Sequence, residues 1–131
     1  MNTLTYKQAF DLITEAYIKG EIKPFDPKFC FCGTLCGNRT TWASVGFRKQ
    51  HHNYSLKQYG QMERALFSPF PEITWLSNGD LDYSVRVEDL PYFEEKLFKG
   101  MTAALEVLRQ IHIERGEVID ETPVFAKRQL A

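Results

Sequence analysis

The chain has 131 residues, of which 44% are hydrophobic and 25% are charged, and its formal net charge is −1. This composition excludes a disordered protein, and the length suits a single domain with one core. The near-zero charge argues against strong electrostatic attraction to nucleic acid or to an anionic membrane. No apolar run approaches the length of a membrane span, and the first residues lack a secretion signal, so we expect a cytoplasmic protein with no membrane partner.

Residues 1–20 predict an N-terminal helix, because apolar side chains recur there at the spacing of one helical face. These side chains are Tyr6, Ala9, Phe10, Ile13, Ala16 and Tyr17. Thr5 and Gln8 have the spacing of a capping box, in which each side chain bonds the backbone N–H of the other residue. Gly20 is placed to end the helix, because glycine readily adopts the left-handed conformation.

Residues 55–68 predict a second helix with the same type of N-terminal cap. Ser55 and Gln58 repeat the capping-box spacing. Tyr54, just before the cap, is placed to pack on Tyr59 in the first turns of this helix as a hydrophobic staple.

Three short runs rich in β-branched and aromatic residues predict strands. The first is 40–47, within a segment 29–54 that also holds the cysteines. The other two, 72–76 and 81–87, flank the Asn78-Gly79 pair, which favours a primed hairpin turn. We therefore expect a hairpin over 72–87 and a small antiparallel sheet.

Residues 91–115 predict a long amphipathic helix that forms the spine of the fold. Its apolar face consists of Phe93, Leu97, Phe98, Met101, Ala104, Leu105, Leu108, Ile111 and His112. We expect Leu105 and Leu108 to be fully buried and His112 to be a hydrogen-bonded core histidine. The predicted fold is a helix-dominated α+β domain spanning residues 1–131, with a tail over 117–131 that docks through Val124 and Phe125 or frays.

The three cysteines, Cys30, Cys32 and Cys36, lie within seven residues, and this cluster has three interpretations. In the first, the three thiolates and His51 or His52 form a tetrahedral zinc site. Against this, one residue separates the first two cysteines, whereas structural zinc sites usually place two to four residues between paired ligands.

In the second interpretation, Cys32 or Cys36 is a catalytic nucleophile and His51 or His52 is its base. No surrounding pattern specifies a cysteine hydrolase. In the third, the cysteines are small buried hydrophobic residues. We favour the third interpretation and therefore expect no metal or other cofactor and no catalytic residue.

The stretch between Asp26 and Glu72 carries six basic residues and one acid, with aromatic residues interspersed. A basic surface with exposed aromatic rings can bind nucleic acid through phosphate contacts and base stacking. The candidates for such contacts are Arg39, Trp42, Arg48 and Lys49. Because the basic residues form no continuous run, we expect no binding of nucleic acid at physiological salt.

Three segments, LTYKQAF, CFCGTLCGN and FAKRQLA, together resemble the layout of small uncharacterised proteins of bacterial prophages and mobile elements. The resemblance implies a bacterial, cytoplasmic accessory protein and carries over no catalytic residues. We expect a non-enzymatic domain that binds another protein or self-associates. The alternatives are a zinc-stabilised nucleic-acid-binding module and a cysteine-dependent enzyme.

Overall fold

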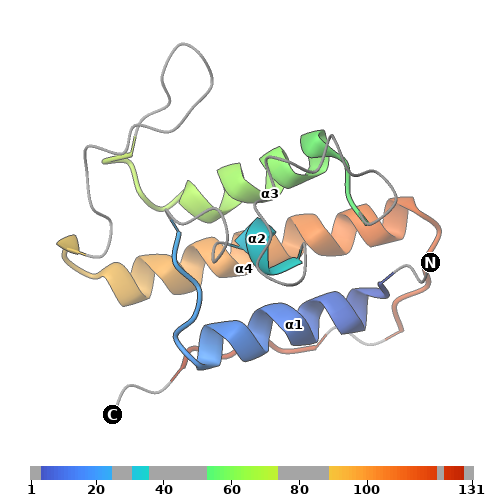
Figure 1. Cartoon of the computed structure of the whole chain (residues 1–131), viewed down its shortest axis with the longest axis horizontal. Helices are drawn as coiled ribbons and strands as arrows, with labels where there is room; N and C mark the ends of the chain where they lie inside the picture. Colours follow the sequence, from blue (N-terminus) through green and yellow to red (C-terminus); the bar gives the residue numbers. More distant parts are fainter. Residues whose placement is uncertain (1–3, 25–30, 36–52, 74–88, 121–122, 129–131) are drawn as a thin grey trace.

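The computed structural model describes residues 4–24, 31–35, 53–73, 89–120 and 123–128, and these residues contain four helices. The helices are α1 (Tyr6–Ile18), α2 (Phe31–Leu35), α3 (Leu56–Phe67) and α4 (Phe93–Glu114). α4 runs antiparallel to both α1 and α3, and the short helix α2 lies between α1 and α3 (Figure 1). The α3–α4 pair makes the most extensive contact among these helices.

The predicted α+β fold is wrong, because the described residues form helices and no strand. The predicted strands 40–47 and 81–87 lie outside the described residues, and only the first two residues of 72–76 are described. At Ile73 the backbone N–H donates to the carbonyl oxygen of Phe70 at 3.0 Å. This bond occupies the backbone N–H of Ile73, which a strand would use to pair with its neighbour. The chain therefore forms a turn after α3.

Both predicted capping boxes are confirmed. At α1, the Thr5 hydroxyl accepts from the backbone N–H of Gln8 at 3.1 Å, and the Gln8 side chain accepts from Thr5 N–H at 2.9 Å. Ser55 and Gln58 make the same pair of bonds at α3, with the same two distances. Gly20 has a φ of +72°, as expected of the residue that ends the α1 turn. A side-chain N-cap typically stabilises a helix by about 1 kcal/mol.

The start of α4 differs from the starts of α1 and α3. Its N-cap, Tyr92, has a φ of +61° and makes no side-chain capping bond. Glu94 and Glu95 lie in the first turn instead, where a negative charge favours the positive end of the helix dipole. The helix therefore begins at Phe93, two residues after the predicted start, and it presents two carboxylates there.

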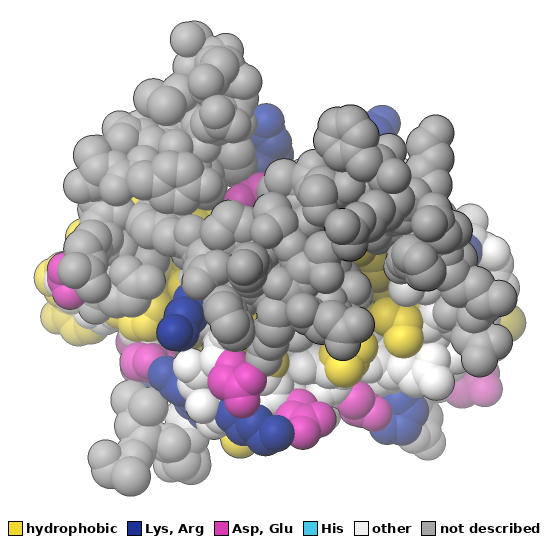
Figure 2. Space-filling view, in the orientation of Figure 1, with side chains coloured by type: hydrophobic (Ala, Val, Ile, Leu, Met, Phe, Trp, Pro, Cys, Tyr) yellow, Lys and Arg dark blue, Asp and Glu magenta, His cyan; other side chains and the backbone are white. Residues whose placement is uncertain are grey.

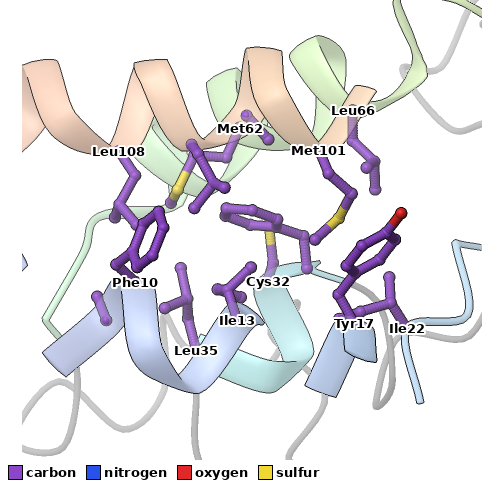
Figure 3. Packing of buried hydrophobic residues seen from close by; sticks show 14 of the residues in the cluster. Phe10, Ile13, Tyr17, Ile22, Cys32, Leu35, Met62, Leu66, Met101 and Leu108 are labelled. Atoms are coloured by element: carbon purple, nitrogen blue, oxygen red, sulfur yellow. The ribbon is translucent and has the colours of Figure 1, made fainter. Parts of the chain in front are cut away.

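The core lies between α1 on one side and α3 with α4 on the other, and α2 packs against both α1 and α3 (Figure 3). Leu105 and Leu108 of α4 are 4% and 0% exposed, which confirms their predicted burial. The side chains labelled in Figure 3 are Phe10, Ile13, Tyr17, Ile22, Cys32, Leu35, Met62, Leu66, Met101 and Leu108. Full burial of one such large apolar side chain contributes roughly 1.5–3 kcal/mol.

The outer face of α1 carries charges of both signs. Lys7 pairs with Asp11 at 3.1 Å and Lys19 pairs with Glu15 at 2.9 Å, and all four side chains are exposed. Figure 2 shows basic and acidic side chains interspersed along the lower edge of the view, where α1 lies in Figure 1. Exposed pairs of this kind contribute only about 0.3–0.5 kcal/mol each.

Within the described residues, no helix combines the length and apolar character needed to cross a bilayer.

Candidate functional site

Most of the candidate residues of the sequence lie outside the described part of the chain. They are Cys30, Cys36, Arg39, Trp42, Arg48, Lys49, His51 and His52. Among the residues that are described, no three His, Cys, Asp or Glu side chains come together as a possible metal site.

Cys32 is described, and its thiol belongs to the core. The residue is 1% exposed, and its Sγ donates to the backbone carbonyl oxygen of Tyr59 at 3.3 Å. It therefore joins α2 to α3 as a small buried side chain. A catalytic thiol must instead reach solvent and form a thiolate near neutral pH.

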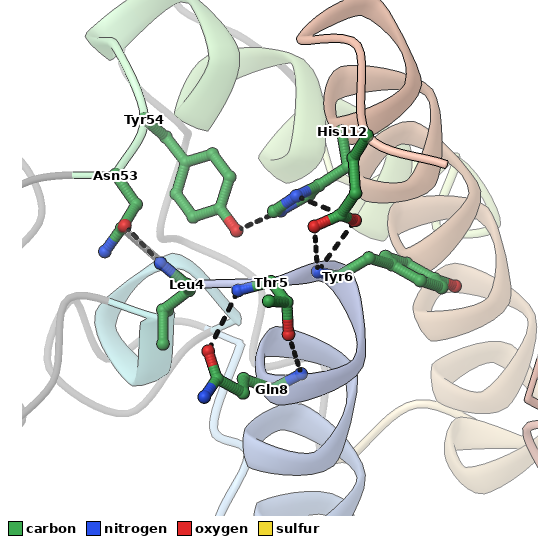
Figure 4. Close-up of polar contacts among 8 residues, drawn as sticks. Leu4, Thr5, Tyr6, Gln8, Asn53, Tyr54 and His112 are labelled. Carbon is green, nitrogen blue, oxygen red and sulfur yellow. Dashed lines mark hydrogen bonds and ion pairs between the residues drawn. The ribbon is translucent and has the colours of Figure 1, made fainter. Parts of the chain in front are cut away.

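His112 lies at the centre of a buried polar cluster, as the sequence predicted for a core histidine. Its Nε2 shares a hydrogen bond of 2.7 Å with the Tyr54 hydroxyl, and its Nδ1 lies 3.4 Å from a carboxylate oxygen of Glu117 (Figure 4). Burial lowers the pKa of His112, and the nearby Glu117 carboxylate opposes this shift. Burial likewise raises the pKa of the Tyr54 hydroxyl.

The same Glu117 side chain caps the first helix. Both of its oxygens accept from the backbone N–H of Tyr6, at 3.0 and 3.2 Å, at the positive end of the α1 dipole. Beside it, the Asn53 side chain accepts from the backbone N–H of Leu4 at 2.8 Å.

This polar cluster joins three separate parts of the chain: 4–6, 53–54 and 112–117. A Glu–His–Tyr series can in principle relay a proton. Here both imidazole nitrogens have protein partners, and His112 and Tyr54 are 1% and 3% exposed. The cluster therefore holds helix ends together rather than presenting a base to a substrate.

A groove with a volume of about 660 Å³ opens next to this cluster, at the N-terminal end of α1. Its walls are formed by Thr5, Tyr6, Lys7, Glu117, Val118, Ile119, Asp120 and Pro123. Val118 is 81% exposed, so an apolar side chain is open to solvent beside the groove. The chain continues from this wall into the C-terminal segment, residues 123–128.

The C-terminal segment runs alongside α1, and side chains hold it against the end of α1 and the start of α4 (Figure 1). It makes no backbone–backbone hydrogen bond to the described residues. The residues that contact it are Tyr17, Gly20, Glu94, Glu95 and Phe98, and this set of contact residues is named here the segment groove.

Phe125 is the apolar anchor of the C-terminal segment. Its ring lies between the ring of Tyr17, at a centroid distance of 4.9 Å, and the ring of Phe98, at 5.1 Å. The predicted docking through Phe125 is therefore confirmed. The predicted docking through Val124 is wrong, because this side chain is 88% exposed and points away from the core.

Two basic side chains follow the anchor and pair with the acids at the start of α4. Arg128 binds both carboxylate oxygens of Glu94, with an Nε–Oε2 distance of 3.2 Å, and its backbone N–H donates to the Tyr17 hydroxyl at 3.2 Å. Lys127 pairs with Glu95. The hydrogen bonds that Arg128 donates to Glu94 raise the pKa of the Arg128 guanidinium, which stays charged.

Sequence reasoning did not relate Glu94 and Glu95 at the start of α4 to the basic residues Lys127 and Arg128. The signal that could have related them is the opposite charge of the first turn of α4 and of residues 127–128. Phe125, Lys127 and Arg128 offer an aromatic and two cations, and the first turn of α4 offers two carboxylates.

No protein-family model matches this chain, and neither a curated protein nor a solved structure matches it. The resemblance to prophage and mobile-element proteins stays a prediction.

Proposed function

We propose that this protein is a non-enzymatic, protein-binding accessory domain that receives an extended segment of a partner protein in the segment groove. One observation carries the proposal: the C-terminal segment already occupies this groove, held by an aromatic anchor and an arginine. Aromatic and arginine side chains dominate the energy of many protein interfaces. The bacterial, cytoplasmic setting belongs to the same proposal and is supported by the sequence resemblance.

The way the C-terminal segment is held supports exchange with another segment. Since no backbone ladder joins it to the described residues, its removal breaks side-chain contacts and leaves the helix hydrogen bonds intact. The contact of α3 with α4 also involves none of its residues. A partner segment can therefore take its place without unfolding the helices.

Because the C-terminal segment is covalently attached to the protein, a partner segment must compete with it for the segment groove. A segment tied to its own site by a short linker has an effective concentration on the order of millimolar. A free peptide of the same sequence should thus bind the intact protein weakly. Weakening the contacts of the tethered segment should open the groove to the peptide.

The test uses the full-length chain carrying Phe125→Ala and Arg128→Ala, which releases the C-terminal segment. A fluorescent, acetylated and amidated peptide of residues 123–128 is titrated into this variant and into the unchanged protein, and anisotropy is measured. We expect the variant to bind the peptide at least about tenfold more tightly, because the tethered competitor is removed. Circular dichroism and the melting temperature verify that the variant is folded.

A folded variant that does not bind the peptide would contradict the proposal. Equal binding to the variant and to the unchanged protein would also contradict it, since the peptide would then be using another surface. Val124→Ala is the matched control in the protein, because it alters an exposed residue of the same segment. It should leave peptide binding as weak as in the unchanged chain.

A further inference from the structure

We infer that the partner segment carries an aromatic side chain followed three positions later by an arginine. This inference rests on the proposed function and specifies the chemistry of the partner. The C-terminal segment shows this spacing at Phe125 and Arg128, the two residues of the segment that make the most enclosed contacts.

The aromatic position follows from the shape of the slot. The Phe125 ring lies nearly parallel to the Phe98 ring, with an interplanar angle of 11°, and is tilted by 49° to the Tyr17 ring. A planar ring can contact both neighbours at once, whereas a branched aliphatic side chain can lie flat on neither. Aromatic pairs of this kind contribute more than the area they bury.

The arginine position follows from three contacts that a lysine cannot all reproduce. Glu94 accepts from two guanidinium nitrogens, and the guanidinium carbon lies 5.7 Å from the centre of the Tyr17 ring. The Arg128 and Glu94 side chains are 18% and 23% exposed, so water screens the pair less than an open surface pair. A planar fork that also stacks on an aromatic ring favours arginine over the compact lysine ammonium.

Gly20 provides the space for this arginine. A Cβ atom at position 20 would lie 2.5 Å from Nη1 of Arg128. The glycine that ends the α1 turn therefore also leaves room for the guanidinium group. A larger residue at position 20 would be strained at this φ and would require the Arg128 guanidinium to shift.

The lysine position should matter little. Lys127 and Glu95 have side chains that are 37% and 57% exposed, and exposed ion pairs contribute little to binding. The specificity of the segment groove thus depends on the aromatic ring and the arginine. Position 127, which lies directly before the arginine, tolerates exchange.

The test compares peptides of residues 123–128 on the folded Phe125→Ala, Arg128→Ala protein. Changing Arg128→Lys in the peptide should weaken binding by about tenfold, since the second charge-assisted hydrogen bond and the stacking are lost. Phe125→Leu should weaken it about fivefold, from the lost aromatic contacts. Lys127→Ala should change it by less than about threefold.

A charge exchange locates the arginine contact. The further substitution Glu94→Lys in the protein should abolish binding of the parent peptide and permit binding of a peptide with Arg128→Glu. If the parent peptide binds but the Lys, Glu and Leu peptides bind equally well, the inference about the partner is wrong and the proposed function survives. If no peptide binds, the proposed function itself fails.

The oligomeric state separates a different protein from a second copy of this chain as the source of the segment. Native mass spectrometry of the unchanged protein over a range of concentrations should show a monomer. A dimer that forms with rising concentration and disappears in the Phe125→Ala, Arg128→Ala variant would assign the groove to a second copy. That result would overturn the inference of a separate partner.

Discussion

Gly100 of α4 contacts the main chain of Leu66 in α3 so closely that a Cβ atom at position 100 would lie 2.1 Å from the Leu66 carbonyl oxygen. Because the obstructing atom is backbone, it cannot move without shifting α3. Gly100→Ala should therefore destabilise the protein by about 1–3 kcal/mol or more, through overpacking of the helix pair. Urea unfolding followed by circular dichroism measures this change.

Gly60→Ala is the matched control, because a Cβ atom at position 60 of α3 meets nothing within 4 Å. Alanine is favoured over glycine inside a helix by about 1 kcal/mol, so this variant should be more stable than the unchanged protein. If both glycine variants changed stability in the same direction, the close approach of α3 and α4 would not be the cause.

Removing the Tyr54 hydroxyl should leave Nε2 of His112 buried without its 2.7 Å partner. Tyr54→Phe should then cost about 1–3 kcal/mol, the usual penalty for a buried polar group that loses its hydrogen bond. Tyr92→Phe removes the hydroxyl from a side chain that is 77% exposed, and it should change stability by less than about 0.5 kcal/mol. A loss of stability in Tyr92→Phe as large as in Tyr54→Phe would contradict this account of the polar cluster.

Burial raises the pKa of Glu63 from its ordinary 4.5 to about 7, although the neighbouring Arg64 lowers it. The unfolded chain loses this proton near pH 4.5 and the folded chain only near pH 7. The contribution of Glu63 to stability is thus fully present below pH 4.5 and is lost as the pH rises through 7. At pH 8 the buried carboxylate should cost up to about 3 kcal/mol.

Glu63→Gln should therefore match the unchanged protein at pH 4 and be more stable at pH 8, as measured by urea unfolding at both values. His112 titrates with the opposite sign, because burial lowers its pKa below 6.5 and stability falls as the pH drops through that range. Both proteins contain His112, so the comparison removes its effect. Exposed Glu114→Gln is the control for the change of a carboxylate to an amide, and it should change stability by less than about 0.5 kcal/mol.

The buried thiol of Cys32 should be protected from reagents. In a Cys30→Ser, Cys36→Ser variant, Cys32 is the remaining thiol, and it should react with a thiol reagent at pH 7 at least about 100-fold more slowly than in urea-unfolded protein. Fast labelling of Cys32 in the folded state would show that α2 opens readily. It would also restore the interpretation of this residue as a nucleophile.

The helices could be predicted from the sequence because their signals are local. The Thr5–Gln8 and Ser55–Gln58 boxes and the apolar face of α4 are repeats within a few residues, and each describes a single element. The strand predicted over 72–76 is described only at its first two residues, where composition alone does not show that Ile73 bonds back to Phe70 in a turn.

The polar cluster and the segment groove could not be predicted, because they pair residues that are distant in the chain. Glu117 bonds Tyr6 and Arg128 bonds Tyr17, in each case across 111 positions. No periodicity marks such a pair. For the Glu94–Arg128 pair, only the opposite charges of the two side chains indicate that each needs a partner.

The contacts of Glu117 with Tyr6 and of Arg128 with Tyr17 also determine when α1 becomes packed in its final position during synthesis. α3 and α4 follow one another among the long helices and can pair as soon as α4 has left the ribosome, because the entropic cost of closing a loop grows only slowly with its length. The N-terminus of α1 waits for Glu117, and Tyr17 waits for Phe125 and Arg128. Until then the apolar face of α1 is incompletely covered in the nascent chain. This exposed face is where aggregation during synthesis would begin.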